Sequence, residues 1–223
     1  MSAFAYARRA MSAPATLRIP STDAELEARW DLPSQVQAVF VMCHPHPQHG
    51  GTMSHPLLHK VTKQLVAGGC GVLRFNFRGV GSSSGEWGDG HAEVDDVGAA
   101  VAEARRSHPS LPLGVGGWSF GAAASLIWQG RQGDASPWVG IAPPVASSLS
   151  QSLPDPTDLA SAPRLFVLGD RDQFVTESEL SDYAESVGGE FELFKGSDHF
   201  FYFREQALAE TISAFLGRVL RAD

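Results

Sequence analysis

The stretch Gly117-Trp118-Ser119-Phe120-Gly121 constrains the fold of this chain more than any other. An apolar run, Leu113–Gly116, precedes it, and a small-residue segment, Ala122–Ile127, follows it. This order predicts a buried strand, a turn too tight for large residues, and then a helix. Glycine on both sides of a serine permits strained backbone angles and close approach of neighbouring elements. We therefore expect the Ser119 hydroxyl to stand exposed at the carboxyl end of a sheet, beside a helix N-terminus.

Length and charge narrow the class of protein. The 223 residues suffice for one α/β domain and are too few for two of ordinary size. Hydrophobic residues make up 43% and charged residues 19%, which is typical of a soluble globular protein. The formal net charge of -8, without a dense run of Lys or Arg, argues against a nucleic-acid partner. Since no apolar run approaches the ~18–20 residues of a spanning helix, we expect no membrane partner.

The first residues do not have the pattern of a signal peptide. Residues 1–13 contain two arginines but no apolar segment after them. We interpret them as a flexible extension, with either Met1 or Met11 as the true start, and residues 14–223 as a single domain.

Two cysteines, Cys43 and Cys70, lie inside apolar runs. Two thiols are too few for a disulfide framework, so a reducing cytoplasm is the expected location. Because Cys43 directly precedes His44, a thiol nucleophile is an alternative to consider. However, Cys43 lies inside a predicted strand and the tight turn carries serine, so we do not adopt that alternative.

Strand and helix patterns alternate along the chain. Two segments of alternating polarity, Thr16–Ile19 and Glu25–Trp30, predict antiparallel strands joined by a turn. Further strands are predicted at Ala38–Cys43, Val72–Phe77, Leu111–Gly116, Trp138–Ala142, Arg164–Leu168 and Glu190–Phe194. Helical spacing recurs over residues 57–65, 94–104, 122–127, 177–187 and 208–216, and the last of these helices is expected to begin directly after the loop that ends at His199. This alternation predicts an α/β fold with a doubly wound, mostly parallel sheet, two antiparallel N-terminal strands, helices on both faces and no lid domain.

Polar segments follow four of the predicted strands. They are His44–Pro47, Ser119, the loop with Asp170 and Asp172, and the loop ending at His199. In such sheets, ligands bind beside the carboxyl ends of the strands. A serine hydroxyl needs a base to remove its proton, an imidazole can supply that base, and a carboxylate can orient the imidazole. The order nucleophile, acid, histidine is the order found in α/β-hydrolases.

The chain resembles the α/β-hydrolase superfamily over nearly its whole length, and more narrowly the small lidless serine hydrolases with a His-Pro-His-Pro loop. The motifs that carry the resemblance are His44-Pro45-His46-Pro47 with Gly50-Gly51, Arg74–Ser82, Gly117–Gly121, Gly169–Asp172 and Gly196–His199. The resemblance implies a serine hydrolase that needs no cofactor. Because no segment is long enough for a separate lid, we expect an open pocket and a preference for small or short-chain acyl esters or thioesters. It implies Ser119 as nucleophile, His199 as base and Asp172 as acid. The alternative acid, Asp170, is better suited to hydrogen bonds with loop N–H groups.

The His44–Pro47 loop admits three interpretations. As an oxyanion loop it would use the N–H of His46, because Pro45 and Pro47 have none, together with the N–H of Phe120. As a metal site it would use some of the five histidines between positions 44 and 59, of which His55 and His59 are four residues apart on a predicted helix. We expect no metal, since no acidic residue joins this group. The histidine side chains could also simply brace the loop.

The remaining expectations concern the pocket and its partners. Candidate pocket residues are His44, Val80, Trp118, Pro143 and Phe200. Most of the aromatic run Phe200–Phe203 is expected in the core, and Arg78 in an ion pair with Asp95 or Asp96. The expected partners are a small acyl substrate and water, and an exposed edge strand or the last helix would allow a homodimer. Alternatives are a peptidase or acyltransferase on the same residues, a non-catalytic interaction module, and a histidine-cluster metal protein.

Overall fold

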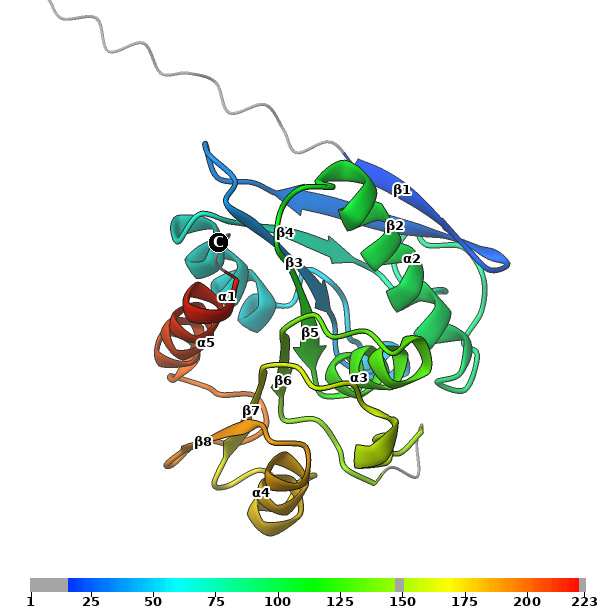
Figure 1. The fold of residues 1–223 in the computed structure, drawn as a ribbon. Coiled ribbons are helices and arrows are strands. Elements are labelled where there is room, and N and C mark those ends of the chain that lie inside the picture. Colours follow the sequence, from blue (N-terminus) through cyan, green and yellow to red (C-terminus); the bar gives the residue numbers. More distant parts are fainter. Residues whose placement is uncertain (1–15, 147–150, 221–223) are drawn as a thin grey trace, which may run out of the picture.

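One twisted sheet organises the computed structural model, which describes residues 16–146 and 151–220 (Figure 1). Residues 1–13 of the expected extension lie outside the described residues. The strands are β1 (Thr16–Ser21), β2 (Ala24–Asp31), β3 (Ala38–Cys43), β4 (Cys70–Phe75), β5 (Leu113–Trp118), β6 (Trp138–Ile141), β7 (Arg164–Gly169) and β8 (Glu190–Phe194). Their order across the sheet is β1-β2-β4-β3-β5-β6-β7-β8. β1 and β2 pair antiparallel, as do β2 and β4, and the other pairs are parallel.

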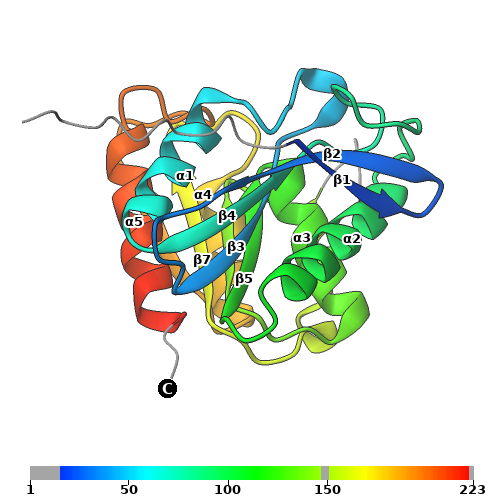
Figure 2. The same ribbon diagram turned by 90° about the horizontal axis from the view of Figure 1, so that it is seen from above.

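Helices cover both faces of the sheet. They are α1 (Pro56–Ala67), α2 (Ala92–Ser107), α3 (Phe120–Gln132), α4 (Glu177–Ser186) and α5 (Glu205–Val219), with short 3-10 turns at Pro47–His49 and Pro156–Asp158. Figure 2 shows α1 and α5 on one face and α2 and α3 on the other. All six residues of β3 are buried, as expected for a strand covered on both faces. The predicted doubly wound α/β sheet with two antiparallel N-terminal strands is confirmed.

The strand order reverses at β3. The chain passes from β3 to β4 on one side and returns to place β5 on the other side of β3. A crevice opens beside the carboxyl ends of strands at such a reversal, because the two crossover connections leave in opposite directions. The topology therefore brings the loop after Cys43 next to the turn after Trp118.

Two elements differ from the sequence-based expectation. β4 ends at Phe75 rather than Phe77, because Asn76 turns its amide towards the Met53 N–H (2.8 Å) and the Glu27 carboxylate (2.8 Å). The last helix begins only at Glu205, since Phe201 and Phe203 have positive φ angles of 55° and 64°. These angles are incompatible with an α-helix.

The aromatic run that precedes α5 is therefore not a helical face. Phe201 is buried, but Tyr202 is 60% and Phe203 97% exposed. The expectation that most of this run lies in the core was wrong. Arg78 does pair with Asp96, through bonds of 2.7 and 3.0 Å from its guanidinium to the carboxylate. The predicted structural ion pair is confirmed.

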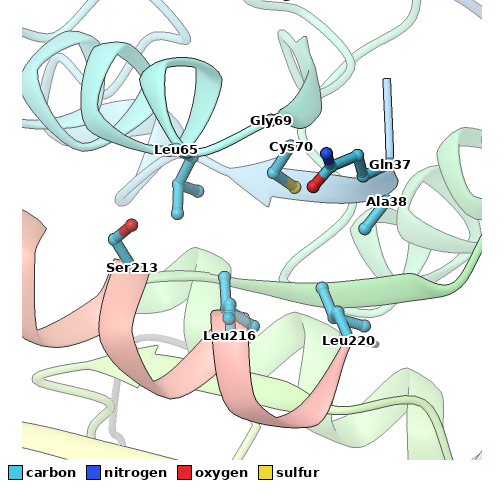
Figure 3. A pocket seen from close by; sticks show the side chains of 10 residues that line it. Gln37, Ala38, Leu65, Gly69, Cys70, Ser213, Leu216 and Leu220 are labelled. Atoms are coloured by element: carbon cyan, nitrogen blue, oxygen red, sulfur yellow. The ribbon is translucent and has the colours of Figure 1, made fainter. Parts of the chain in front are cut away.

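A cavity of about 590 Å³ opens at the amino ends of β3 and β4, between α1 and α5. Figure 3 shows the side chains of Leu65, Leu216 and Leu220 pointing into this space, with Cys70 and Gln37 beside them. It lies at the opposite end of the strands from Ser119. No helix in the described part of the chain has the length and apolar character needed to span a membrane.

Candidate active site

A second cavity, of about 380 Å³, lies at the carboxyl ends of the strands. It is bounded by the loops that follow β3, β5, β6, β7 and β8. Its lining residues are Pro45, His46, His49, Gly50, Gly51, His55, Trp118, Ser119, Phe120, Pro144, Ala146, Phe174, His199 and Phe200. Loops that are far apart in the sequence thus line one cavity, as expected because ligands bind beside the carboxyl ends of the strands in such sheets.

Ser119 stands on a strained turn between β5 and α3. Its φ of 52° and ψ of -120° lie outside the regions that non-glycine residues prefer. A Cβ atom at Gly117 would lie 2.5 Å from the Cys43 carbonyl oxygen, and one at Gly121 would overlap the His44 carbonyl. The two glycines let β3 approach the turn closely, and the Ser119 N–H donates to the Ile141 carbonyl (2.7 Å) from the other side. The turn is therefore fixed by strands on both sides.

His199 is hydrogen-bonded to Asp172. The Nδ1–H of His199 donates to Asp172 Oδ2 at 2.7 Å, and both side chains are almost completely buried. The second carboxylate oxygen accepts the N–H groups of Phe174 (2.8 Å) and Val175 (3.0 Å). A proton on Nδ1 leaves the Nε2 lone pair of His199 available as a base. These three bonds fix the direction of the carboxylate and of the ring.

Asp170 has a different partner. Its carboxylate accepts the Gly196 N–H at 2.6 Å and so joins the loop after β7 to the loop after β8. Of the two candidate acids, the structure places Asp172, and not Asp170, against His199.

The two candidate oxyanion donors lie on the wall of this cavity. Phe120 is the first residue of α3, where N–H groups have no acceptor within the helix. The loop before α1 is tightly turned, since the His46 carbonyl accepts the N–H groups of His49 (3.1 Å) and Gly51 (3.0 Å). A side chain at Gly51 would overlap the Pro45 carbonyl, so only glycine fits there.

An aromatic contact links the two candidate donors. The Trp87 ring centroid lies 4.8 Å from that of His46 and 5.4 Å from that of Phe120. The rings of His46 and Phe120 are 5.2 Å apart, which closes a triangle. Trp87 is not among the residues that line the cavity, but its ring contacts both residues that do.

The other histidines have structural partners. His44 Nε2 accepts the Phe77 N–H (3.0 Å), and its Nδ1–H donates to the Pro45 carbonyl (2.6 Å). Burial lowers the pKa of His44 from 6.5 to about 4, so its ring is neutral and braces the loop.

His55 caps a helix rather than lying within it. Its Nδ1 accepts the Leu57 N–H at 3.2 Å, and its ring packs edge-on against Trp118. His55 is the N-cap residue of α1, one position before its first residue, and its carbonyl accepts the His59 N–H at 3.0 Å. Within residues 16–146 and 151–220, no three His, Cys, Asp or Glu side chains are grouped to hold a metal ion. Cys43 is fully buried, which raises the pKa of its thiol.

Sequence reasoning located the pocket only in part. Trp118 and Phe200 line the cavity, whereas His44 and Val80 do not. Pro143 is buried, and its neighbour Pro144 lines the cavity instead. The lining residues that were not expected include His49, His55, Ala146 and Phe174. Phe174 could have been found by the strand-end rule, because it lies in the loop directly after β7.

The sheet order and the strand–turn–helix around Ser119 define an α/β-hydrolase. Residues 34–157, more than half of the chain, match the family described as serine aminopeptidase, S33. The chain belongs to this family of α/β serine hydrolases.

Similar proteins extend over nearly the whole chain. A lidless α/β serine hydrolase of Xanthomonas campestris shares 26% identity, with a TM-score of 0.81 and coverage of 96% of this chain and 98% of that one. An α/β serine hydrolase homologue of Coxiella burnetii shares 30% identity, with a TM-score of 0.79 and coverage of 91% and 97%. An uncharacterised protein of Rickettsia prowazekii is 28% identical over 207 residues, 87% of this chain and 85% of its own. A Pyrococcus furiosus esterase, at 19% identity and a TM-score of 0.80, shares the fold.

Proposed function

We propose that this protein cleaves esters or thioesters of small or short-chain acyl groups through a covalent acyl-enzyme. The observation that carries the proposal is the 2.7 Å bond between His199 and a buried Asp172, in loops that also enclose Ser119 on its strained turn. His199 would take the hydroxyl proton while Ser119 Oγ attacks the carbonyl carbon. It would then protonate the leaving alkoxide or thiolate, and water would release the acyl group by the same steps in reverse order.

The negative charge on the carbonyl oxygen needs donors that are already in place. We assign this role to the backbone N–H groups of Phe120 and His46. Removing one such donor typically raises the barrier by about 3–4 kcal/mol. The packing of both side chains on Trp87 supports a preorganised position for the two N–H groups.

The lining of the cavity favours an ester over the amino-terminal peptide bond that the family's description names. None of the described lining residues is Asp or Glu. An aminopeptidase must bind a free ammonium group, and a desolvated cation without an anionic partner is costly. The volume of about 380 Å³ is near the lower end for small-molecule sites, which favours short acyl groups. The unpaired thiols of Cys43 and Cys70 also support a reducing, cytoplasmic location.

A fluorophosphonate probe, which reacts with an activated serine, tests the proposal. We expect labelling of the wild-type protein and of Ser213→Ala, a serine in the other cavity, and none of Ser119→Ala or His199→Ala. Circular dichroism establishes that each variant is folded. A folded wild-type protein that stays unlabelled would contradict the proposal. Turnover that EDTA abolishes would instead favour a metal-dependent reaction.

A panel of p-nitrophenyl esters tests the preference for short acyl groups. We expect kcat/KM to fall from acetate and butanoate to longer linear chains. Equal or faster turnover of the long chains would contradict this part of the proposal.

A further inference from the structure

Aromatic rings surround His199 on the cavity side. The ring of Phe174 meets the His199 ring at 4.8 Å and 78°, and that of Phe200 meets it at 5.6 Å and 84°. Trp118 completes the wall, with its centroid 5.8 Å from that of Phe200 at 83°. Phe174 comes from the loop after β7, Phe200 from the loop after β8, and Trp118 from the end of β5. Three separate elements therefore supply one aromatic surface.

Phe174 is exposed although it lines a cavity. Folding leaves 67% of this residue in contact with solvent, while Trp118 behind it is 1% exposed. A large apolar ring at the rim of a concave site is available to a ligand rather than to the core.

The position of Phe200 is fixed from its other side. Tyr202 stacks on it at 5.6 Å and 26°, and the residue between them, Phe201, is buried in the core. Phe201 has a φ of 55°, a strained angle that turns its own ring inwards and leaves its neighbours outside. The ring of Phe200 is thus held at the cavity wall by a local arrangement of backbone.

The wall offers no charged partner to a ligand. None of the described lining residues is Asp, Glu, Lys or Arg. Burial also lowers the pKa of His55, which favours the neutral form of that imidazole. The part of a substrate that touches this wall is therefore uncharged.

The position of His199 indicates which part of the substrate touches the aromatic wall, because His199 protonates the leaving group. Under the proposed function, on which this step rests, the C–O bond to the leaving group breaks and His199 gives that oxygen its proton. The leaving group must then lie beside His199, where Phe174 and Phe200 are. The acyl group faces the other wall, which is formed by the tight loop with Gly50 and Gly51.

We propose that the alcohol or thiol part of the substrate carries an uncharged aromatic ring, which binds against Phe174 and Phe200. The substrate class is then an ester or thioester of a small acid with an arylalkyl alcohol or thiol. The reaction forms the Ser119 acyl ester, breaks the bond to the leaving group, and transfers the serine proton through His199 to that group. Water supplies the oxygen that completes the hydrolysis.

Three acetate esters test this proposal: benzyl, cyclohexylmethyl and methyl acetate, with acid release followed in a pH-stat. Benzyl and cyclohexylmethyl alcohol have the same number of carbons and are both primary. Each kcat/KM is divided by the rate constant for alkaline hydrolysis of the same ester, so the comparison of these normalised values isolates the contact of the aromatic ring with the protein. Aromatic contacts change an equilibrium constant by a factor of about 2 to 10. We expect kcat/KM for the benzyl ester to exceed that of the cyclohexylmethyl ester by a factor in this range, and methyl acetate to be the slowest.

Variants of two exposed phenylalanines assign the effect to one residue. Phe174→Ala and Phe174→Leu should bring the benzyl-to-cyclohexylmethyl ratio close to one. Phe203→Ala, which removes a ring that is 97% exposed and not in the cavity lining, should keep the wild-type ratio. Because both esters depend on the same His199, the ratio cancels any effect of the variants on that residue.

Each outcome has a defined meaning. A wild-type ratio near one, or a ratio that Phe174→Ala leaves unchanged, would overturn the proposal. A preference for methyl 3-phenylpropanoate over methyl butanoate larger than the benzyl preference would overturn the assignment of the ring to the leaving group. If no ester is hydrolysed and the fluorophosphonate probe does not react, the proposed function itself has failed, and this inference fails with it.

Discussion

The two ends of the sheet each carry a cavity, and the larger of the two is not the candidate active site. The amino-end cavity measures about 590 Å³ and the carboxyl-end cavity about 380 Å³. Both are lined by apolar side chains with a few polar atoms. Only the carboxyl end brings a serine together with a histidine that is bonded to a buried carboxylate. In this fold, convergent polar groups mark the candidate site better than volume does.

The two cavities also differ in the surroundings of their nucleophilic side chains. Cys70 lines the amino-end cavity, but burial raises the pKa of its thiol to about 12, so almost no thiolate forms at neutral pH. Ser119 is a weaker nucleophile by itself, yet it shares its cavity with the Nε2 lone pair of His199. A hydroxyl or thiol becomes an effective nucleophile only when a neighbouring group removes its proton or lowers its pKa.

Turns at the two ends of the sheet also differ in which residues adopt positive φ angles. At the amino end the turn before β4 uses Gly69, with a φ of 87°, where a positive angle has little cost. At the carboxyl end Ser119 has a φ of 52° and Ala142, directly after β6, has a φ of 47°. A glycine thus makes the turn before β4, whereas the turn after β5 holds a serine at a strained angle and presents its side chain to the cavity.

The largest expected difference between the two ends is in turnover. Ser119→Ala should lower kcat by about 10⁴–10⁶, because it removes the nucleophile and leaves only the contribution of the oxyanion donors. Cys70→Ser, at the other end, should keep the wild-type rate. The rates are measured with p-nitrophenyl acetate. A large loss in Cys70→Ser, with Ser119→Ala still active, would reverse the comparison.

The next effect is on stability. Gly121→Ala should lower the free energy of unfolding by about 3–5 kcal/mol, since the added methyl group overlaps the His44 carbonyl. Gly217→Ala, in α5 beside the other cavity, should raise it by about 0.5–1 kcal/mol, because a Cβ there meets no atom within 4 Å. Urea unfolding measures both. Equal effects of the two substitutions would show that the turn around Ser119 is not sterically special.

Substitutions of two tryptophans, one in contact with the candidate site and one away from it, separate an effect on kcat from an effect on stability. Trp87→Ala should lower kcat about 10- to 100-fold with KM changed less than about twofold, because Trp87 contacts the two residues proposed to supply the oxyanion donors and is not among the residues that line the cavity. Trp87→Phe should recover most of the rate. Trp30→Ala, which loses a contact with His108 away from the cavity, should affect stability and leave kcat unchanged. A raised KM with unchanged kcat in Trp87→Ala would indicate contact with substrate instead.

The last prediction concerns how the stability of the protein responds to pH at His44. Its pKa is about 4 in the folded protein and 6.5 ordinarily, so between these values the unfolded chain binds an additional proton. Stability is then fully present above pH 6.5 and falls as the pH is lowered, by about 2 kcal/mol at pH 5. His44→Gln keeps an acceptor for the Phe77 N–H but cannot titrate, so its unfolding free energy should fall less between pH 7.5 and 5. Parallel pH profiles for the two proteins would show that His44 does not titrate on unfolding.

Much of the fold follows from local sequence pattern. The apolar runs predict strands, and the residues that stop them, such as Pro45 after β3 and Gly169 at the end of β7, predict where side chains are presented. The bounds that were missed have non-local causes. β4 ends two residues early because Asn76 bonds to Met53 and Glu27, which are far away in the sequence.

The site shows the same limit. Ser119, His199 and the loop with Asp170 and Asp172 could be named because each follows a strand, and parallel strands end at one edge of the sheet. Only the resemblance to α/β-hydrolases favoured Asp172 over Asp170. The partner of His199 could not be decided from spacing, since Asp170 and Asp172 lie in the same loop. The chain turns directly after β7, where the Asp172 N–H donates to the Gly169 carbonyl (3.1 Å), and this turn sends one carboxylate towards Gly196 and the other towards the imidazole.

The sequence by itself determined the strand–turn–helix around Ser119, because glycine, serine and small residues in that order leave few other conformations. Only the tertiary structure decided which residues form the walls of the cavity. Phe174 and Phe200 are 26 positions apart in the sequence, yet both rings contact His199 in the folded chain. Trp87 is 41 positions from His46, and their rings also come into contact only through folding. Contacts of this kind depend on where loops cross in space, which no local pattern encodes.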